Sequence, residues 1–175
     1  MNRLDSKTRT QVISALLEGC SIRSTVRMTG VSKKTVMRLL VEAGAVAATF
    51  QDQLFRNLDC KRLQLDELWA FIAAKQKNVT PEIAAKNPAA GDVWPWVAID
   101  ADTKLVPSWT LGNRDLQTAY AFVDDLTARL KNRVQLTTDG HRPYVEAIER
   151  AFAGFVDYSI LQKIYGKPGE NETRY

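Results

Sequence analysis

The chain has 175 residues, of which 45% are hydrophobic and 25% charged, values typical of a globular protein rather than a disordered chain. It contains no run of about 18 apolar residues, and its polar N-terminus lacks the apolar core of a signal peptide, so we expect neither a membrane span nor secretion. Two cysteines, Cys20 and Cys60, and a single histidine exclude a four-ligand zinc ribbon and a disulfide framework, and we therefore expect a cytoplasmic protein.

The net charge of +4 is concentrated near the N-terminus. Residues 1–44 contain eight Lys or Arg and three Asp or Glu, whereas the other 131 residues contain sixteen and seventeen. A basic segment joined to a nearly neutral body indicates a module that binds a polyanion, attached to a second domain. A solvated basic helix face is the alternative interpretation.

The apolar spacing of the basic segment predicts three helices. The first covers residues 5–18, whose apolar side chains fall on one face. The second covers residues 22–29, and the third begins after Ser32 and is expected to end at Gly44. Because a Gly-Val-Ser turn joins the second helix to the third, the pattern is that of a helix-turn-helix motif.

In a helix-turn-helix motif, the second helix of the motif enters the major groove of DNA and its first turns contact bases and phosphates. The outward-facing candidate contacts on the two helices are Arg23, Arg27, Lys33, Lys34, Thr35 and Arg38. We therefore predict that residues 1–44 are a helix-turn-helix domain that binds double-stranded DNA. A three-helix bundle used for dimerisation is the alternative.

The remainder of the chain predicts a helical linker followed by a mixed sheet. Residues 45–61 resemble a further helix that runs into a linker, and residues 75–91 are polar and predict a loop. Period-two apolar patterns predict strands at residues 63–72, 93–99, 104–111, 134–138 and 155–161, and helical patterns predict helices at 115–130 and 143–152. We expect the first three strands to form an antiparallel meander, and the first strand to be covered on both faces. Residues 62–175 are thus predicted to form an α+β or α/β domain, a mixed sheet flanked by helices.

Two acidic residues in this domain are candidate metal ligands. Asp66 lies within the first, apolar strand, and Asp139 ends the fourth strand just before a glycine. A carboxylate in an apolar strand is costly unless it is paired or binds a cation, and two carboxylates on neighbouring strands can share divalent ions. A turn cap at Asp139 and an ion pair at Asp66 are the structural alternatives. Glu67 is expected to point to the opposite face and to be a poor co-ligand for Asp66.

Three segments, LQLDELWAFIAAKQKN, GDVWPWVAIDADTKLVPSW and VQLTTDGHRPYVEAIERAF, resemble the catalytic domain of bacterial insertion-sequence transposases, closest to the insertion sequence one family. DELW and TDGHRPY are the specific parts, and the resemblance covers nearly the whole chain. It implies an RNase H-like fold and a DDE mechanism that depends on Mg²⁺ or Mn²⁺, with Asp66 as the first acid and Asp139 as the second. It also implies a homo-oligomer that acts on the terminal repeats of a mobile element at the nucleoid.

The resemblance leaves the third acid unassigned. In such enzymes it is a glutamate on a helix after the fifth strand, whereas here only Glu170 and Glu172 follow, in a polar tail that contains glycine. We therefore expect a C-terminally truncated transposase with a partial catalytic domain, which does not catalyse strand transfer alone.

Several further residues have mainly structural interpretations. His141, two residues after Asp139, is expected to cap the following helix, although contact with a phosphate or a metal-bound water is the alternative. The four tryptophans are expected to lie in the core or on helix-covered sheet rather than to stack on DNA; they are Trp69, Trp94, Trp96 and Trp109.

Two other functions fit the same residues. The chain could be a non-catalytic DNA-binding protein that occupies element ends and represses transposition. It could also be a transcription regulator in which the helix-turn-helix is joined to a domain that binds a small molecule. A buried pair of metal-binding acids would favour an enzyme, and an apolar pocket without either acid would favour the regulator.

Overall fold

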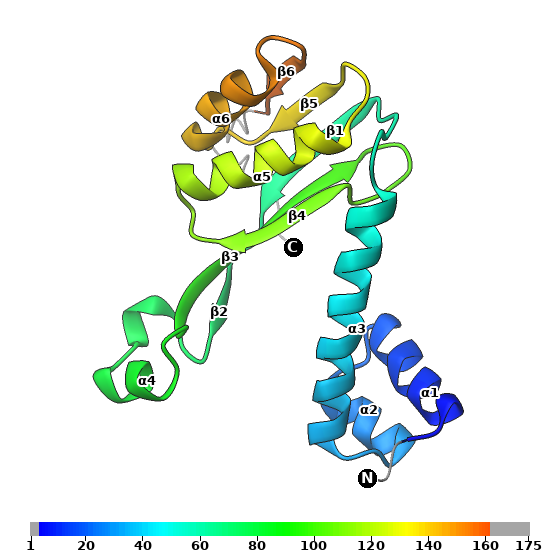
Figure 1. Cartoon of the computed structure of the whole chain (residues 1–175). Helices are drawn as coiled ribbons and strands as arrows, with labels where there is room; N and C mark the ends of the chain where they lie inside the picture. Colours follow the sequence, from blue (N-terminus) through cyan, green and yellow to red (C-terminus); the bar gives the residue numbers. More distant parts are fainter. Residues whose placement is uncertain (1–3, 162–175) are drawn as a thin grey trace, which may run out of the picture. The chain divides into compact units, whose positions relative to one another are not determined.

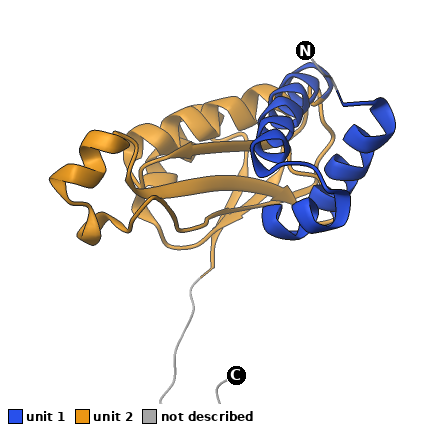
Figure 2. Ribbon diagram, turned by 90° about the horizontal axis from the view of Figure 1, so that it is seen from below, with its two compact units in different colours: residues 1–54 blue, residues 55–175 orange. Residues whose placement is uncertain are grey.

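The computed structural model describes residues 4–161, which contain six α-helices, one 3₁₀ helix and a six-stranded mixed sheet. The chain divides into two compact units, Met1–Leu54 and Phe55–Tyr175, which Figure 2 shows in separate colours. Among the helices of residues 4–161, none combines the length and apolar character that a bilayer crossing requires. Glu170 and Glu172 lie outside the described residues.

The N-terminal unit consists of three helices, α1 (Ser6–Leu17), α2 (Ile22–Thr29) and α3 (Lys33–Leu54). Side-chain oxygens of Asp5 and Ser21 cap the first two helices by accepting backbone N–H groups in their first turns. Gly30 ends α2 with a φ of 69°, a left-handed conformation that glycine adopts without a steric penalty. The small core of this unit is formed by Val12, Val31, Val36 and Leu39.

The third helix does not end at Gly44, so that part of the sequence prediction is wrong. Helix α3 continues without interruption to Leu54, so the further helix predicted within residues 45–61 is the C-terminal part of α3. An isolated glycine costs only about 1 kcal/mol relative to alanine inside a helix, and no capping residue follows it here. The favourable helical residues on both sides therefore outweigh its cost.

The C-terminal unit contains the sheet, whose strands run in the order β4-β3-β1-β5-β6, with β2 also paired to β3 (Figure 1). The strands are β1 (Arg62–Glu67), β2 (Ala70–Ile72), β3 (Gly91–Asp100), β4 (Ser108–Gly112), β5 (Gln135–Thr138) and β6 (Asp157–Ile160). Strand β3 is antiparallel to β1, β2 and β4, whereas β5 is parallel to β1 and β6. The predicted antiparallel meander is confirmed, and the first and fourth predicted strands are neighbours.

The strand predicted at residues 63–72 is interrupted and forms β1 and β2. Both pair with β3 in one register, since Glu67 lies opposite Trp96 and Ala70 opposite Val93. In the gap, the Leu68 N–H donates to the Pro95 carbonyl at 2.9 Å. The reciprocal bond cannot form because proline has no N–H, which explains the break in the ladder.

The segment predicted as a loop at residues 75–91 contains two short helices, η1 (Gln76–Asn78) and α4 (Pro81–Lys86). Thr80 caps α4 and Pro81 occupies its first turn, a start signal that the polar composition of the segment obscures. Figure 1 shows that β2, η1 and α4 project from the end of the sheet, away from its other helices. We call residues 68–91 the arm.

Helices α5 (Leu116–Arg129) and α6 (Arg142–Phe152) pack on one face of the sheet (Figure 1). The core between them and the strands includes Leu63, Leu65, Trp96, Phe122, Leu126, Leu136 and Ile148. On the opposite face, Gln64 and Asp66 are exposed. The expectation that the first strand is covered on both faces is therefore wrong for the described residues.

Candidate metal centre

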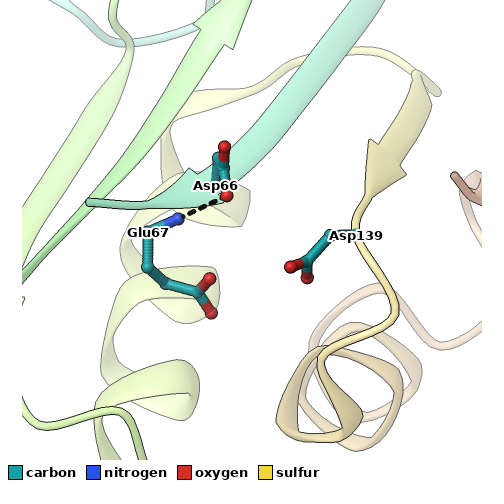
Figure 3. A group of neighbouring side chains, drawn as sticks. All are labelled: Asp66, Glu67 and Asp139. Carbon is teal, nitrogen blue, oxygen red and sulfur yellow. Dashed lines mark hydrogen bonds between the residues drawn. The ribbon is translucent and has the colours of Figure 1, made fainter. Parts of the chain in front are cut away.

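Neighbouring strand ends bring Asp66 and Asp139 together, as their positions in the sequence predict. Strands β1 and β5 are parallel, and Leu65 pairs with Thr138. Asp66 is the next residue of β1, and Asp139 follows the last residue of β5. One carboxylate oxygen from each of Asp66, Glu67 and Asp139 lies within 4.8 Å of the others (Figure 3), so this group can hold a metal ion.

Glu67 belongs to this group, contrary to the prediction that it is a poor co-ligand for Asp66. Alternation between faces does hold within β1, where Asp66 is exposed and the Glu67 side chain is only 1% exposed. However, β1 ends at Glu67, and Asp139 lies beyond the end of β5. Figure 3 shows the Glu67 and Asp139 carboxylates facing the space between the two strand ends, where the two faces of the sheet no longer separate them.

The environment of Glu67 favours its neutral form. Burial raises its pKa to about 7, and the nearby charges of Asp139 and Asp66 act in the same direction, whereas Arg114 opposes them. Its Oε1 is buried without a hydrogen-bond partner among the described residues, as are His141 Nε2 and the Tyr144 hydroxyl. Unsatisfied polar atoms are costly in a protein interior, so their concentration beside the acids fits a site that binds a cation or a polar group.

Arg114 is a member of the site that the sequence analysis missed. Its Nη2 lies 3.7 Å from Glu67 Oε2 and 3.7 Å from Asp139 Oδ2, and its guanidinium lies 5.2 Å from the centroid of a Trp94 ring. Arg114 follows β4, which leaves the sheet at the end where β1 and β5 also end. An arginine directly after a strand was the available signal, but its use required the strand order.

His141 occupies the N-cap position of α6, but its side chain does not cap the helix, which corrects the expectation. The backbone N–H of His141 donates to Asp139 Oδ1 at 2.9 Å, so the turn cap considered for Asp139 is present as well. The imidazole Nε2 instead lies 3.6 Å from Glu67 Oε1. Burial and the positive charge of Arg114 lower the pKa of His141, so a neutral imidazole is favoured at this position.

The candidate DNA-contacting residues lie on α2 and on the first turns of α3. Five of the six are exposed, namely Arg23, Arg27, Lys33, Lys34 and Arg38. Thr35 is partly buried, and its backbone N–H donates to the hydroxyl of Ser32 at the start of α3. Arg38 Nε lies 3.5 Å from a carboxylate oxygen of Glu42, one helical turn further on.

The exposed face of the sheet contains a hollow of about 400 Å³ that includes both acids. Its apolar lining comes from Val97 and Ile99 of β3 together with Leu65, Leu68 and Leu161, and its polar lining includes Gln64, Asp66, Thr137 and Asp139. The hollow therefore places Asp66 and Asp139 beside an exposed surface of the sheet.

The chain matches no protein-family model and no curated protein.

Proposed function

We propose that this chain is a bacterial insertion-sequence DNA transposase, or a piece of one, with a helix-turn-helix domain and an RNase H-like catalytic domain. Asp66 and Asp139 would bind Mg²⁺ or Mn²⁺ for phosphodiester cleavage and strand transfer. The observation that carries the proposal is the proximity of these two acids, which lie at the ends of adjacent parallel strands with carboxylate oxygens within 4.8 Å.

The sheet topology supports the fold that the family resemblance implies. An RNase H-like sheet has the first and fourth strands as neighbours, and the corresponding β1 and β5 pair here in parallel. Strands β3 and β4 continue the sheet on one side of β1 as an antiparallel meander, and β6 extends it beyond β5. This order brings the acid within the first strand and the acid after the fourth to one end of the sheet.

The donor set of the site is suited to a hard divalent cation. Carboxylate oxygens are the ligands that Mg²⁺ and Mn²⁺ prefer, and Asp66 is exposed on the open face of the sheet. When bound, such an ion stabilises charge on the oxygens that enter and leave the phosphorus during phosphodiester cleavage. The protein itself orients Asp139, because its two carboxylate oxygens contact the His141 N–H and the Arg114 guanidinium.

The N-terminal unit supplies the features needed to bind duplex DNA. Lys33 and Lys34 are exposed on the first turn of α3, and Arg23 and Arg27 are exposed on the preceding helix. Cationic side chains on a helix and on the element before it can neutralise phosphates on both sides of a groove. We propose that this unit recognises the ends of the element and that copies of the chain assemble there.

A metal-binding measurement tests the catalytic site. We expect Mn²⁺ to bind in isothermal titration and to raise the unfolding temperature, and Asp66→Asn and Asp139→Asn to abolish both effects. Glu149→Gln, which alters an exposed acid on α6, is the matched control and should leave both unchanged. Equal Mn²⁺ affinity in Asp66→Asn and the native chain would contradict the proposed site.

A DNA assay then tests the reaction. The substrate is duplex DNA from both sides of the gene, since a transposase gene lies between the ends of its own element. Cleavage that requires Mg²⁺ or Mn²⁺ and is lost in Asp66→Asn supports the enzyme. The same assay is run on a version of the protein that extends past Tyr175, if the reading frame continues there. Specific binding of these ends without cleavage by either version favours the non-catalytic DNA-binding protein.

A further inference from the structure

The arm exposes two aromatic side chains, Trp69 and Phe71, of which Trp69 was predicted to lie in the core or on helix-covered sheet. Trp96 is fully buried, as expected, but Trp69 is 43% exposed and Phe71 48% exposed. Their ring centroids lie 5.6 Å apart, so they form one continuous aromatic surface. Neighbouring exposed aromatic rings are costly in water and indicate a surface that binds a partner.

Cations lie over the aromatic rings on this side of the sheet. Lys75 Nζ lies 4.9 Å from the centroid of the Trp69 ring, and the Arg114 guanidinium lies 5.2 Å from that of Trp94. The arm contains three lysines and one glutamate, so its net charge is positive. Asp92, the residue after the arm, accepts the backbone N–H of Gln76 with its carboxylate. The aromatic surface is therefore combined with positive charge.

This surface leads to the acidic group. Because β1 and β2 pair with β3 in one register, Trp69 falls at the position opposite Trp94. Arg114, which lies over Trp94, is 3.7 Å from Asp139. Phe71, Trp69 and Trp94 thus form a row of positions that ends at Arg114, which contacts the candidate metal ligand Asp139. The arm projects beyond the sheet, away from α5 and α6 (Figure 1).

We propose that the arm binds single-stranded DNA, with bases stacked on Trp69 and Phe71 and phosphates near Lys75 and Arg114. Unpaired bases offer the flat faces that stack on aromatic side chains, whereas the bases of a duplex are already stacked on one another. A protein partner is disfavoured because the cores of protein interfaces are depleted of lysine, and here a lysine lies directly over the exposed tryptophan.

The inference rests on the proposed function, since it assigns the arm to the unpaired strand beside the cleaved bond. It adds a second DNA contact that does not involve the N-terminal unit. Stacking on one aromatic side chain typically changes the affinity for single strands by about tenfold. The arm should therefore influence single strands far more than duplex DNA, which the basic residues of α3 bind.

Fluorescence anisotropy with a labelled 15-nucleotide single strand and a duplex of the same sequence tests this assignment on the full chain. We expect Trp69→Leu to weaken single-strand binding about tenfold and Trp69→Phe to retain most of it, because phenylalanine preserves an aromatic face. Both should leave duplex affinity unchanged. Trp109 on β4 is 48% exposed, so the prediction that it lies in the core or on covered sheet is wrong for this residue as well. Trp109→Leu therefore removes a tryptophan of similar exposure and is the matched control, expected to bind like the native chain.

Three results would overturn the inference. One is native single-strand affinity in Trp69→Leu, and another is an equal loss of single-strand and duplex affinity. The third is a change of oligomeric state in Trp69→Leu, measured by light scattering, with single-strand affinity unchanged; that result would assign the arm to contacts between copies of the chain. The Mn²⁺ titration of Asp66→Asn separates the two proposals, because it reports on the acidic group without DNA.

Discussion

Replacing Glu67 by glutamine should change the pH dependence of stability in a direction that the structure determines. Burial raises the pKa of Glu67 from 4.5 to about 7, so the folded state binds this proton more tightly than the unfolded state does. A carboxyl group with a raised pKa favours folding fully below pH 4.5, and this contribution is lost as the pH rises through 7. The native chain therefore carries a buried charge at pH 8 that Glu67→Gln lacks.

The size of the effect follows from the two pKa values. A difference of one pKa unit corresponds to 1.36 kcal/mol, so the raised pKa amounts to about 3 kcal/mol once the pH exceeds both values. We expect Glu67→Gln to be nearly as stable as the native chain at pH 4.5 and more stable by up to about 3 kcal/mol at pH 8. Interactions with Arg114 and the two aspartates are already contained in this difference.

Urea unfolding followed by tryptophan fluorescence at several pH values measures the free energy of unfolding of both proteins. EDTA must be present, because a bound divalent cation would compensate the carboxylate charge. Glu149→Gln on α6 is the control, since this glutamate is exposed and its replacement should not alter the pH dependence. A stability difference between Glu67→Gln and the native chain that stays constant from pH 4.5 to 8 would refute the reasoning.

Three further predictions concern other parts of the chain. Replacing Lys33, Lys34 and Arg38 by alanine should reduce the slope of log affinity against log salt by about 0.9 per lost phosphate contact, and an unchanged slope in a salt titration would contradict duplex binding by α3. Tyr144→Phe removes a buried hydroxyl without a partner among the described residues, so urea unfolding should show unchanged stability or a gain of about 1 kcal/mol, and a clear loss would mean that the hydroxyl is bonded. Asp115→Ala removes the side chain that caps α5 and should cost about 1 kcal/mol, whereas no loss in the same assay would show that the cap is dispensable.

Most of the C-terminal sheet could be predicted from the sequence because its strands and helices differ in period. The predicted ranges 115–130 and 143–152 lie within one residue of α5 and α6 at each end. The interruption at Leu68 could not be predicted in the same way. It depends on which residue lies opposite Pro95, and this register is set by pairing between segments distant in the sequence.

The candidate site was predictable only in part. Asp66 and Asp139 stood out because one lies in an apolar strand and the other at a strand end. Both positions can be recognised from the local sequence, without knowing which strands are adjacent in the sheet. Glu67 was set aside because period-two alternation was applied at the last residue of a strand, where it no longer decides which groups a side chain can reach. Arg114 and Trp69 required tertiary information, namely where β4 ends and how far the helices cover β3.

The distribution of local conflicts in the C-terminal unit supports a binding role for the acidic group. Among the described residues, four buried side-chain atoms lack hydrogen-bond partners, and three of them belong to Glu67, His141 and Tyr144. Burial, followed by the charges of Glu67, Asp66 and Asp139, raises the pKa of Tyr144, whose ring centroid lies 6.0 Å from that of His141. A structural ion pair would satisfy its own atoms, as Arg129 and Asp125 do with two hydrogen bonds of 2.8 and 2.9 Å. Clusters of polar groups that destabilise the folded state are typical of functional sites, where residues are retained for binding or catalysis rather than for stability.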